Sequence, residues 1–185
     1  MGSRTRPADA ARQVSLLRGI NVGSAKRIAM AQLREIYESI GCRDVMTHLG
    51  SGNVVLRDGR APEEVSSAAE EAIHRVLGID VRVVGRTADE IAAAVAADPW
   101  PDADRDHRHV VFLSARPDRA GVAALEDAAT GGEAARLVGR DVHLLLPNGI
   151  GRTKLSQGLV EKRLGVVATA RNWRTVTRLA ELARD

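Results

Sequence analysis

The fold of this chain is decided by the stretch Leu16-Leu17-Arg18-Gly19-Ile20-Asn21-Val22-Gly23 and by the residues that follow it. The apolar run from Val14 to Leu17 predicts a short buried strand. A glycine-rich, basic segment then continues to Lys26-Arg27, which predicts a loop. Apolar residues at helical spacing start at Met30, and Gly41 stands where a helix C-cap belongs. The chain therefore opens with a strand, a glycine-basic loop and a helix.

The segments that follow extend this start into a β-α-β-β-α-β order. Two β-rich runs, 45–49 and 53–56, flank Gly50-Ser51-Gly52 and predict a hairpin. Pro62 stands at the preferred first position of a helix that Gly78 closes. A further strand is expected over 81–84. This order is that of a split βαβ, or ferredoxin-like, unit.

The second half repeats the order. We expect a strand over 110–113, a helix over 117–129, a hairpin of 134–138 and 141–146, a helix over 154–164, a strand over 166–169, and a last helix from Arg171 or Asn172 to Ala183. A second glycine-basic loop, 147–154, follows its third strand. The repeated order predicts a mixed α/β fold of the α+β type. It contains two tandem ferredoxin-like units with antiparallel four-stranded sheets, plus a linker helix and a C-terminal helix.

The expected domain organisation follows from composition along the chain. We predict a flexible N-terminal arm over 1–13, a first unit over 14–86, a connecting helix and linker over 87–109, and a second unit with the C-terminal helix over 110–185. Thr87 and Glu90 have the spacing of a capping box at the start of the connecting helix. The polar residues 102–109 form the linker.

Composition restricts the classes of protein that this chain can be. It has 185 residues, 44% hydrophobic and 28% charged, which is typical of a folded protein with a buried core. The single cysteine, Cys42, excludes an internal disulfide and suits a reducing compartment. No apolar run approaches the ~20 residues of a membrane span. We expect a cytoplasmic protein without a membrane partner, and the oligomeric state stays open.

The predicted topology gathers polar and basic residues into two clusters. Strands 1 and 2 of the first unit run the same way, so the first loop and the hairpin turn lie at one end of the sheet. In the second unit, the loop after strand 3 and the exit of strand 4 share an end. The first cluster consists of Arg18, Asn21, Gly23, Lys26, Arg27, Ser51 and Asn53. The second consists of Arg152, Lys154, Arg171, Asn172 and Arg174, with Trp173 beside them.

Four motifs in this chain resemble the bacterial family known as domain of unknown function 1697. They are the stretch 16–23, Ser51-Gly52-Asn53-Val54-Val55, Lys154-Leu155 and Arg171-Asn172-Trp173, in the family's order and spacing. The resemblance covers nearly everything after Gln13. It implies a cytosolic bacterial protein with two ferredoxin-like halves, and it implies no established activity. His48 and Gly50 depart from the aromatic and larger polar residues usual there, which makes this hairpin tip less suited to stacking a ligand.

The strongest charge feature lies in residues 152–178. Seven basic residues against Glu161 alone give this stretch a formal charge of +6, whereas the whole chain carries +3. The basic residues are Arg152, Lys154, Lys162, Arg163, Arg171, Arg174 and Arg178. A polarised basic face is typical of polyanion binders, and glycine-rich loops before helices can cradle phosphate. The favoured function is therefore binding of nucleic acid or another phosphate-bearing partner.

Two alternatives remain open at this point. One is a small-ligand protein or enzyme with a polar pocket around Arg18, Asn21, Ser51, Asn53 and Arg171. The other is an interaction module whose sheets pair with other chains. Neither glycine loop has the Walker spacing, which argues against nucleotide hydrolysis.

The remaining motifs do not indicate a catalytic or metal-binding site. Ser51 lacks the G-x-S-x-G context of a nucleophile elbow. Asp102-x-Asp104-x-Asp106 lacks the later glycine and glutamate of a calcium loop, and His107-x-His109 has no further ligands nearby. We expect no catalytic residue, no metal and no cofactor, and we expect Trp173 to be a packing anchor.

Overall fold

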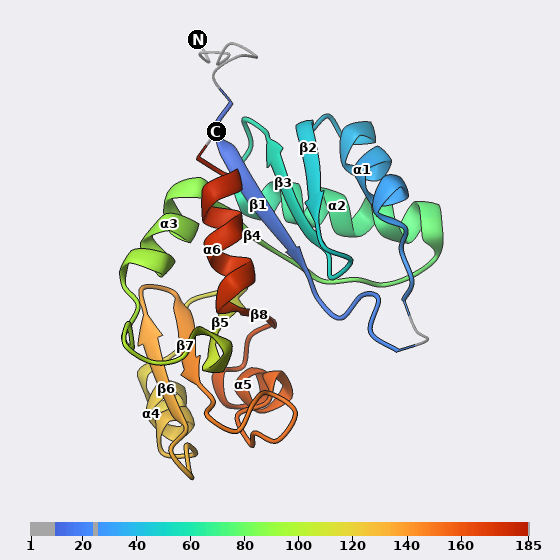
Figure 1. Ribbon diagram of the computed structural model, residues 1–185. Coiled ribbons are helices and arrows are strands. Elements are labelled where there is room, and N and C mark those ends of the chain that lie inside the picture. The colour runs from blue at the N-terminus through green and yellow to red at the C-terminus, as the bar shows by residue number, and fades with distance from the viewer. Residues whose placement is uncertain (1–9, 24–25, 185) are drawn as a thin grey trace. The chain divides into compact units, whose positions relative to one another are not determined.

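The computed structural model describes residues 10–23 and 26–184, which form two repeats of one element order (Figure 1). The expected arm over 1–13 lies largely outside the described residues. The first repeat comprises β1 (Arg12–Leu17), α1 (Met30–Ser39), β2 (Arg43–His48), β3 (Asn53–Arg57), α2 (Pro62–Leu77) and β4 (Val83–Thr87). Helix α3 (Ala88–Ala96) and a 3₁₀ turn (Arg105–His107) follow. The second repeat comprises β5 (Arg108–Leu113), α4 (Arg119–Glu126), β6 (Ala134–Val138), β7 (Asp141–Leu145), α5 (Gln157–Leu164) and β8 (Ala168–Asn172), and α6 (Trp173–Leu182) comes last.

Both repeats form a four-stranded antiparallel sheet with the ferredoxin-like strand order. The first sheet has the order β2-β3-β1-β4, and the second has the order β6-β7-β5-β8. The central strand of each sheet pairs with two neighbours, so that Leu16 faces Asn53 on one side and Val84 on the other. In the second sheet, His109 faces Leu144 and Asn172 in the same way. The predicted fold of two tandem ferredoxin-like units is therefore confirmed.

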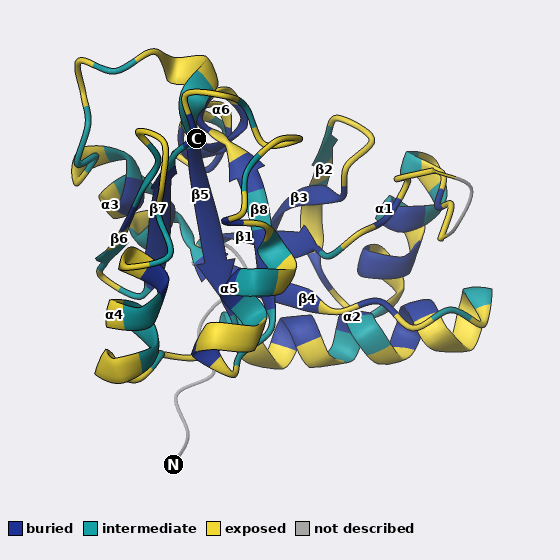
Figure 2. Cartoon of the chain, turned by 90° about the horizontal axis from the view of Figure 1, so that it is seen from below, coloured by how far each residue is buried: buried dark blue, intermediate teal, exposed yellow. Residues whose placement is uncertain are grey.

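The core of the first unit lies between its sheet and helices α1 and α2. Leu33, Ile36 and Tyr37 of α1 are buried together with Leu17 and Val54 of the sheet. Alternation along the strands produces this face, because every second side chain points toward the helices. Figure 2 shows the same amphipathicity in α2, whose buried and exposed residues lie on opposite sides. The two helices thus cover one face of the sheet.

The second unit has a smaller core of the same kind. Val111, Leu113 and Leu144 of the sheet are buried with Leu125 of α4 and Val160 of α5. Helices α4 and α5 are only 8 residues long each, whereas α2 has 16 residues. Strand β5 is buried along nearly its whole length (Figure 2).

Several element boundaries differ from those that the sequence predicts. Strand β1 already begins at Arg12, inside the expected arm, because Arg12 and Gln13 pair with Arg57 and Leu56 of β3. The polar linker ends before Arg108, because the buried His109 belongs to β5. The expected helix 154–164 starts only at Gln157, where the Ser156 hydroxyl caps it.

Two strands end later in the chain than the sequence predicts, and one helix is shorter than predicted. Strands β4 and β8 extend to Thr87 and Asn172, beyond the expected 81–84 and 166–169. Both continue along the central strand until a helix begins directly after them. Helix α4 covers less than the expected 117–129. The capping box at Thr87 and Glu90 is confirmed, since each residue's backbone N–H donates to the other's side chain, at 2.9 and 3.1 Å.

The chain divides into two compact units, which are described separately. One comprises Met1–Ile91 together with Leu179–Asp185, and the other comprises Ala92–Arg178. Helix α6 therefore contributes residues to both units. Within the described residues, no helix has the length and apolar character that crossing a membrane requires.

Candidate polyanion-binding surface

The β1–α1 loop of the first unit is held in place by Asn21. Its side-chain oxygen accepts from the N–H of Ile28 at 2.9 Å, and its amide nitrogen donates to the carbonyls of Ile28 and Gly50, at 3.0 and 2.7 Å. Asn21 adopts a positive φ of 54°, a conformation that asparagine tolerates better than most residues. The loop therefore lies against the β2–β3 turn, as the topology predicts.

The polar residues of the β2–β3 turn are engaged in holding that turn. The fully buried Asn53 donates to the His48 carbonyl at 2.8 Å and to the Ser51 hydroxyl at 3.1 Å. Gly52 has a φ of +77°, and a Cβ there would lie 2.7 Å from the Cβ of Leu17. The amide groups of Asn21 and Asn53 thus serve internal hydrogen bonds, which weakens the case for a polar pocket built from them.

The start of α1 combines exposed cations with an uncapped helix end. Lys26 and Arg27 are exposed, and Arg27 donates to the carbonyl of Gly23 at 3.2 Å. No side chain caps α1 at Ala29, and its first turn has no acidic residue. Free backbone N–H groups and the helix dipole favour an anion at such an end. Arg18 belongs to the same end of the sheet, since its backbone N–H donates to the Arg82 carbonyl at 2.8 Å.

Three residues of the second cluster are occupied elsewhere. Arg171 is only 8% exposed, donates to the Thr169 hydroxyl and the Ala170 carbonyl at 2.7 and 2.8 Å, and burial lowers its pKa to about 10. Asn172 accepts from the N–H of Thr175 and so caps α6. Arg174 forms two hydrogen bonds with the carboxylate of Asp106, at 2.6 and 2.8 Å. Arg171 and Arg174 therefore add little free positive charge to the surface, and the neutral amide of Asn172 is used as a helix cap.

Four exposed cations of the second unit instead lie just before helix α5 or in its last turn. Arg152 and Lys154 precede the helix, and Lys162 and Arg163 occupy its last turn. All four side chains are exposed, and within the described part of the chain none of them forms an ion pair. Lys162 and Arg163 contribute to the +6 stretch, but sequence reasoning did not single them out as site residues. We call Arg152, Lys154, Lys162 and Arg163 the α5 cation set.

A shallow groove lies beside the α5 cation set. It has a volume of about 410 Å³ between α4 and α5. Its lining consists of Ala120, Gly121, Ala124, Leu159, Lys162 and Arg163. The first three residues share one face of α4, and the last three share one face of α5, because both sets follow helical spacing.

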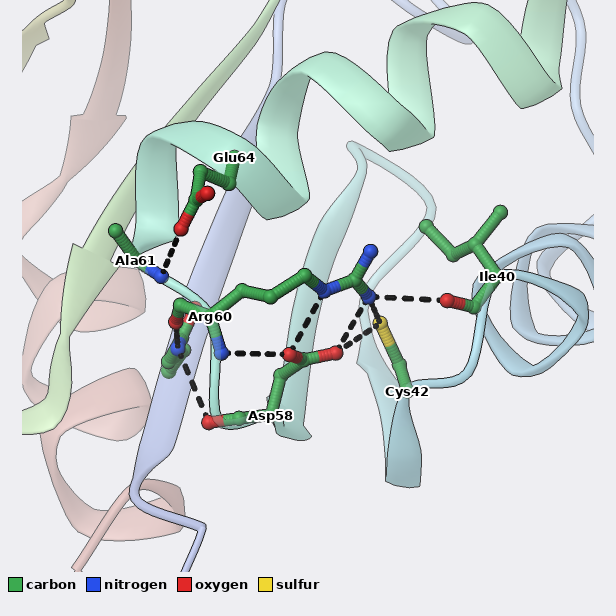
Figure 3. Close-up of polar contacts among 7 residues, drawn as sticks. Ile40, Cys42, Asp58, Arg60, Ala61 and Glu64 are labelled. Carbon is green, nitrogen blue, oxygen red and sulfur yellow. Dashed lines mark hydrogen bonds and ion pairs between the residues drawn. The ribbon is translucent and has the colours of Figure 1, made fainter. Parts of the chain in front are cut away.

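A charged cluster in the first unit, shown in Figure 3, is a structural clamp. Arg60 contacts the carboxylate of Asp58 through two nitrogens, at 2.6 and 2.9 Å, and donates to the Ile40 carbonyl at 3.0 Å. This hydrogen bonding holds the pKa of Asp58 below its ordinary value. Burial, together with the neighbouring Asp58 carboxylate, raises the pKa of Cys42 to about 12. The thiol therefore stays protonated at neutral pH, which argues against a nucleophilic role.

Trp173 anchors a second charged cluster, in the second unit. The guanidinium of Arg108 lies 4.9 Å from the centre of the Trp173 ring and pairs with Asp98. The ring of His143 lies 6.2 Å from the same indole, and burial lowers the pKa of His143. Trp173 is itself only 7% exposed. Its surroundings support the expected role of packing anchor.

The acidic residues and histidines near the 3₁₀ turn serve separate structural roles. Asp104 accepts from the N–H of Asp106 at 2.9 Å, and Asp106 binds Arg174. His109 is buried in β5, where burial lowers its pKa. In the described ranges of the chain, no three side chains of metal-ligating type converge.

Comparison with known proteins agrees with this architecture. The model of the family described as Protein of unknown function (DUF1697) matches residues 11–143. The chain belongs to this family. A search of curated proteins finds no match. Among solved structures, this DUF1697 protein is similar to the conserved bacterial protein SP0830 from Streptococcus pneumoniae, at 18% sequence identity and a TM-score of 0.76. That match covers 95% of this chain and 99% of the other, and at this identity it shows a shared fold alone.

Proposed function

We propose that this DUF1697 protein binds nucleic acid or another phosphate-rich polymer through the α5 cation set. The observation that carries the proposal is that these four exposed cations lie just before or within one short helix and form no ion pair among the described residues. Unpaired cations in such a group attract a polyanion, because each phosphate contact releases a condensed counterion. Only four of the seven basic residues in the stretch 152–178 therefore belong to the proposed binding surface.

The start of α1 supports the same chemistry in the first unit. Lys26 and Arg27 are exposed beside an uncapped helix end, and Arg18 lies at the same end of the sheet. A phosphate group at this end would receive both ionic and backbone N–H contacts. This second set is proposed as an additional contact.

Salt dependence of binding tests the proposal. We expect labelled oligonucleotides to bind with an affinity that falls linearly with salt on a log-log plot, with a slope of about −0.9 per phosphate contacted on duplex DNA. Lys162→Ala and Arg163→Ala should each weaken binding and flatten the slope by roughly one unit. The measurement is fluorescence anisotropy over a series of salt concentrations. Absence of binding at low salt would rule the proposed function out.

The first unit supplies a matched control for these variants. Arg75 is an exposed cation in the last turn of α2, just as Lys162 and Arg163 are in the last turn of α5. Arg75→Ala should leave both affinity and slope nearly unchanged. Arg174→Ala should also leave the slope unchanged, because Asp106 already neutralises that guanidinium. An equal effect at all four positions would indicate attraction by net charge rather than a defined surface.

A further inference from the structure

The groove between α4 and α5 combines an apolar floor with a cationic edge. Ala120, Ala124 and Leu159 supply the floor, and Lys162 and Arg163 supply the edge. No carboxylate is among the residues that line it. The occupant that matches such a groove has an apolar body and carries negative charge at its border.

The groove exists because two helices approach closely at one point and carry short side chains beside it. A Cβ on Gly121 would lie 2.6 Å from the carbonyl oxygen of Arg163, so only glycine permits this approach. Ala120 and Ala124 lie on the same face of α4 as Gly121. Their methyl groups fill little of the space between the helices. The floor is therefore formed by the short alanine side chains and by Leu159.

Two carboxylates that adjoin these helices accept hydrogen bonds from backbone N–H groups. Asp118 accepts from the N–H of Gly121 at 2.6 Å and caps α4. Glu161 accepts from the N–H of Ala168 at 2.9 Å. Lys162 and Arg163 have no such partner among the described residues, and they remain exposed to solvent. The two charged side chains that line the groove, Lys162 and Arg163, are thus both cations.

A nucleotide within a single strand has the required form. Its base is flat and largely apolar on its faces, and its phosphate is anionic. In a duplex the bases are paired and stacked, so a side groove of this kind cannot receive one.

We infer that the α4–α5 groove receives one unstacked base of a single-stranded nucleic acid while the α5 cation set contacts its phosphates. This inference rests on the proposed function and specifies its substrate class. The groove has no aromatic side chain, so the base is held by apolar contact and with little sequence preference.

The test compares three probes of known composition on the full chain by fluorescence anisotropy and competition. They are a labelled oligothymidylate, a duplex of the same length, and inorganic polyphosphate as a competitor without bases. The groove-filling variant is Ala124→Leu, and the matched control is Ala123→Leu, because Ala123 is exposed on α4 but does not line the groove. Circular dichroism and thermal melting are the controls that check whether both variants fold.

We expect the wild-type protein to bind the single strand more tightly than the duplex, by about fivefold for one base placed on apolar surface. Ala124→Leu should remove this preference and leave duplex binding unchanged, whereas Ala123→Leu should retain it. Equal affinity for single strand and duplex, a preference that survives Ala124→Leu, or polyphosphate that competes as well as the oligonucleotide would each overturn the inference and leave polyanion binding intact. Absence of binding to any probe at low salt would instead overturn the proposed function itself.

Discussion

The two units of this protein share an element order and a strand order, and they differ in how polar groups secure that common frame. In the first unit, Asp58 and Arg60 join the end of β3 to the end of α1 by charged hydrogen bonds. In the second unit, Trp173 gathers Arg108 and His143 around an indole ring. One topology is thus built with two unrelated polar anchors.

This difference shows that the apolar pattern and the polar anchors determine different features of each unit, namely the strand order and the positions of particular loops. Central strands that are buried along nearly their whole length occur in both units, with Leu17 and Leu113 at equivalent places on them. The anchors then hold particular loops. Glycine contacts differ in the same way, since Gly85 of β4 meets Pro62 of α2, while Gly121 of α4 meets Arg163 of α5. Each unit therefore has its own most sensitive positions.

Truncation of the indole should have the largest effect. Trp173→Ala removes a buried aromatic ring, and we expect the protein to lose about 3–5 kcal/mol of stability. Urea denaturation followed by circular dichroism measures the loss. Trp100→Ala is the control, because Trp100 is only half-buried and should lose less. A loss of equal size at both positions would contradict the assignment of Trp173 as the anchor.

The charged clamp of the first unit should contribute less, and in a pH-dependent way. Asp58→Asn weakens charge-assisted hydrogen bonds, which are worth about 1.5–3 kcal/mol. Because the folded-state pKa of Asp58 is lowered, its contribution is present above the unfolded pKa and is lost as pH falls through the folded pKa.

Urea denaturation of the wild type and of Asp58→Asn at about pH 7 and at about pH 3 tests this expectation, and the gap in stability should narrow at the lower pH. Asp44→Asn is the control, since Asp44 pairs with Arg57 at 3.2 Å but is 62% exposed. That exposed pair should be worth less than about 1 kcal/mol. A gap that is independent of pH would contradict the role of the Asp58 carboxylate.

The smallest effect is expected at the helix starts. Ala29→Ser supplies the cap that α1 lacks, and it should stabilise the protein by about 0.5–1 kcal/mol. Ser156→Ala removes the cap of α5 and should destabilise by a similar amount. Thermal melting of both variants measures the two shifts, which should have opposite signs. Destabilisation by Ala29→Ser would show that the start of α1 is not free to accept a cap.

The sequence was sufficient to predict the architecture, because apolar periodicity and turn residues are local signals. It was also sufficient to place the β1–α1 loop beside the hairpin turn, where Asn21 reaches Gly50. The sequence could not predict which basic side chains are exposed and without an ionic partner. Arg171 is buried although alternation along β8 turns it away from the core residues Ala168 and Ala170. Arg174 meets an acidic residue 68 positions away. The groove depends on the approach of Gly121 to Arg163, which no local pattern encodes.

Helix α6 has a consequence for how this protein is made. The residues of the first unit up to Ile91 leave the ribosome first, but that unit also includes the chain from Leu179 onward. Leu179, Ala180 and Ala183 are buried, and they belong to the first unit although they lie at the end of the chain. During translation, all strands of the first unit are therefore synthesised before the second unit. The last segment of the first unit is synthesised only after the second unit is complete.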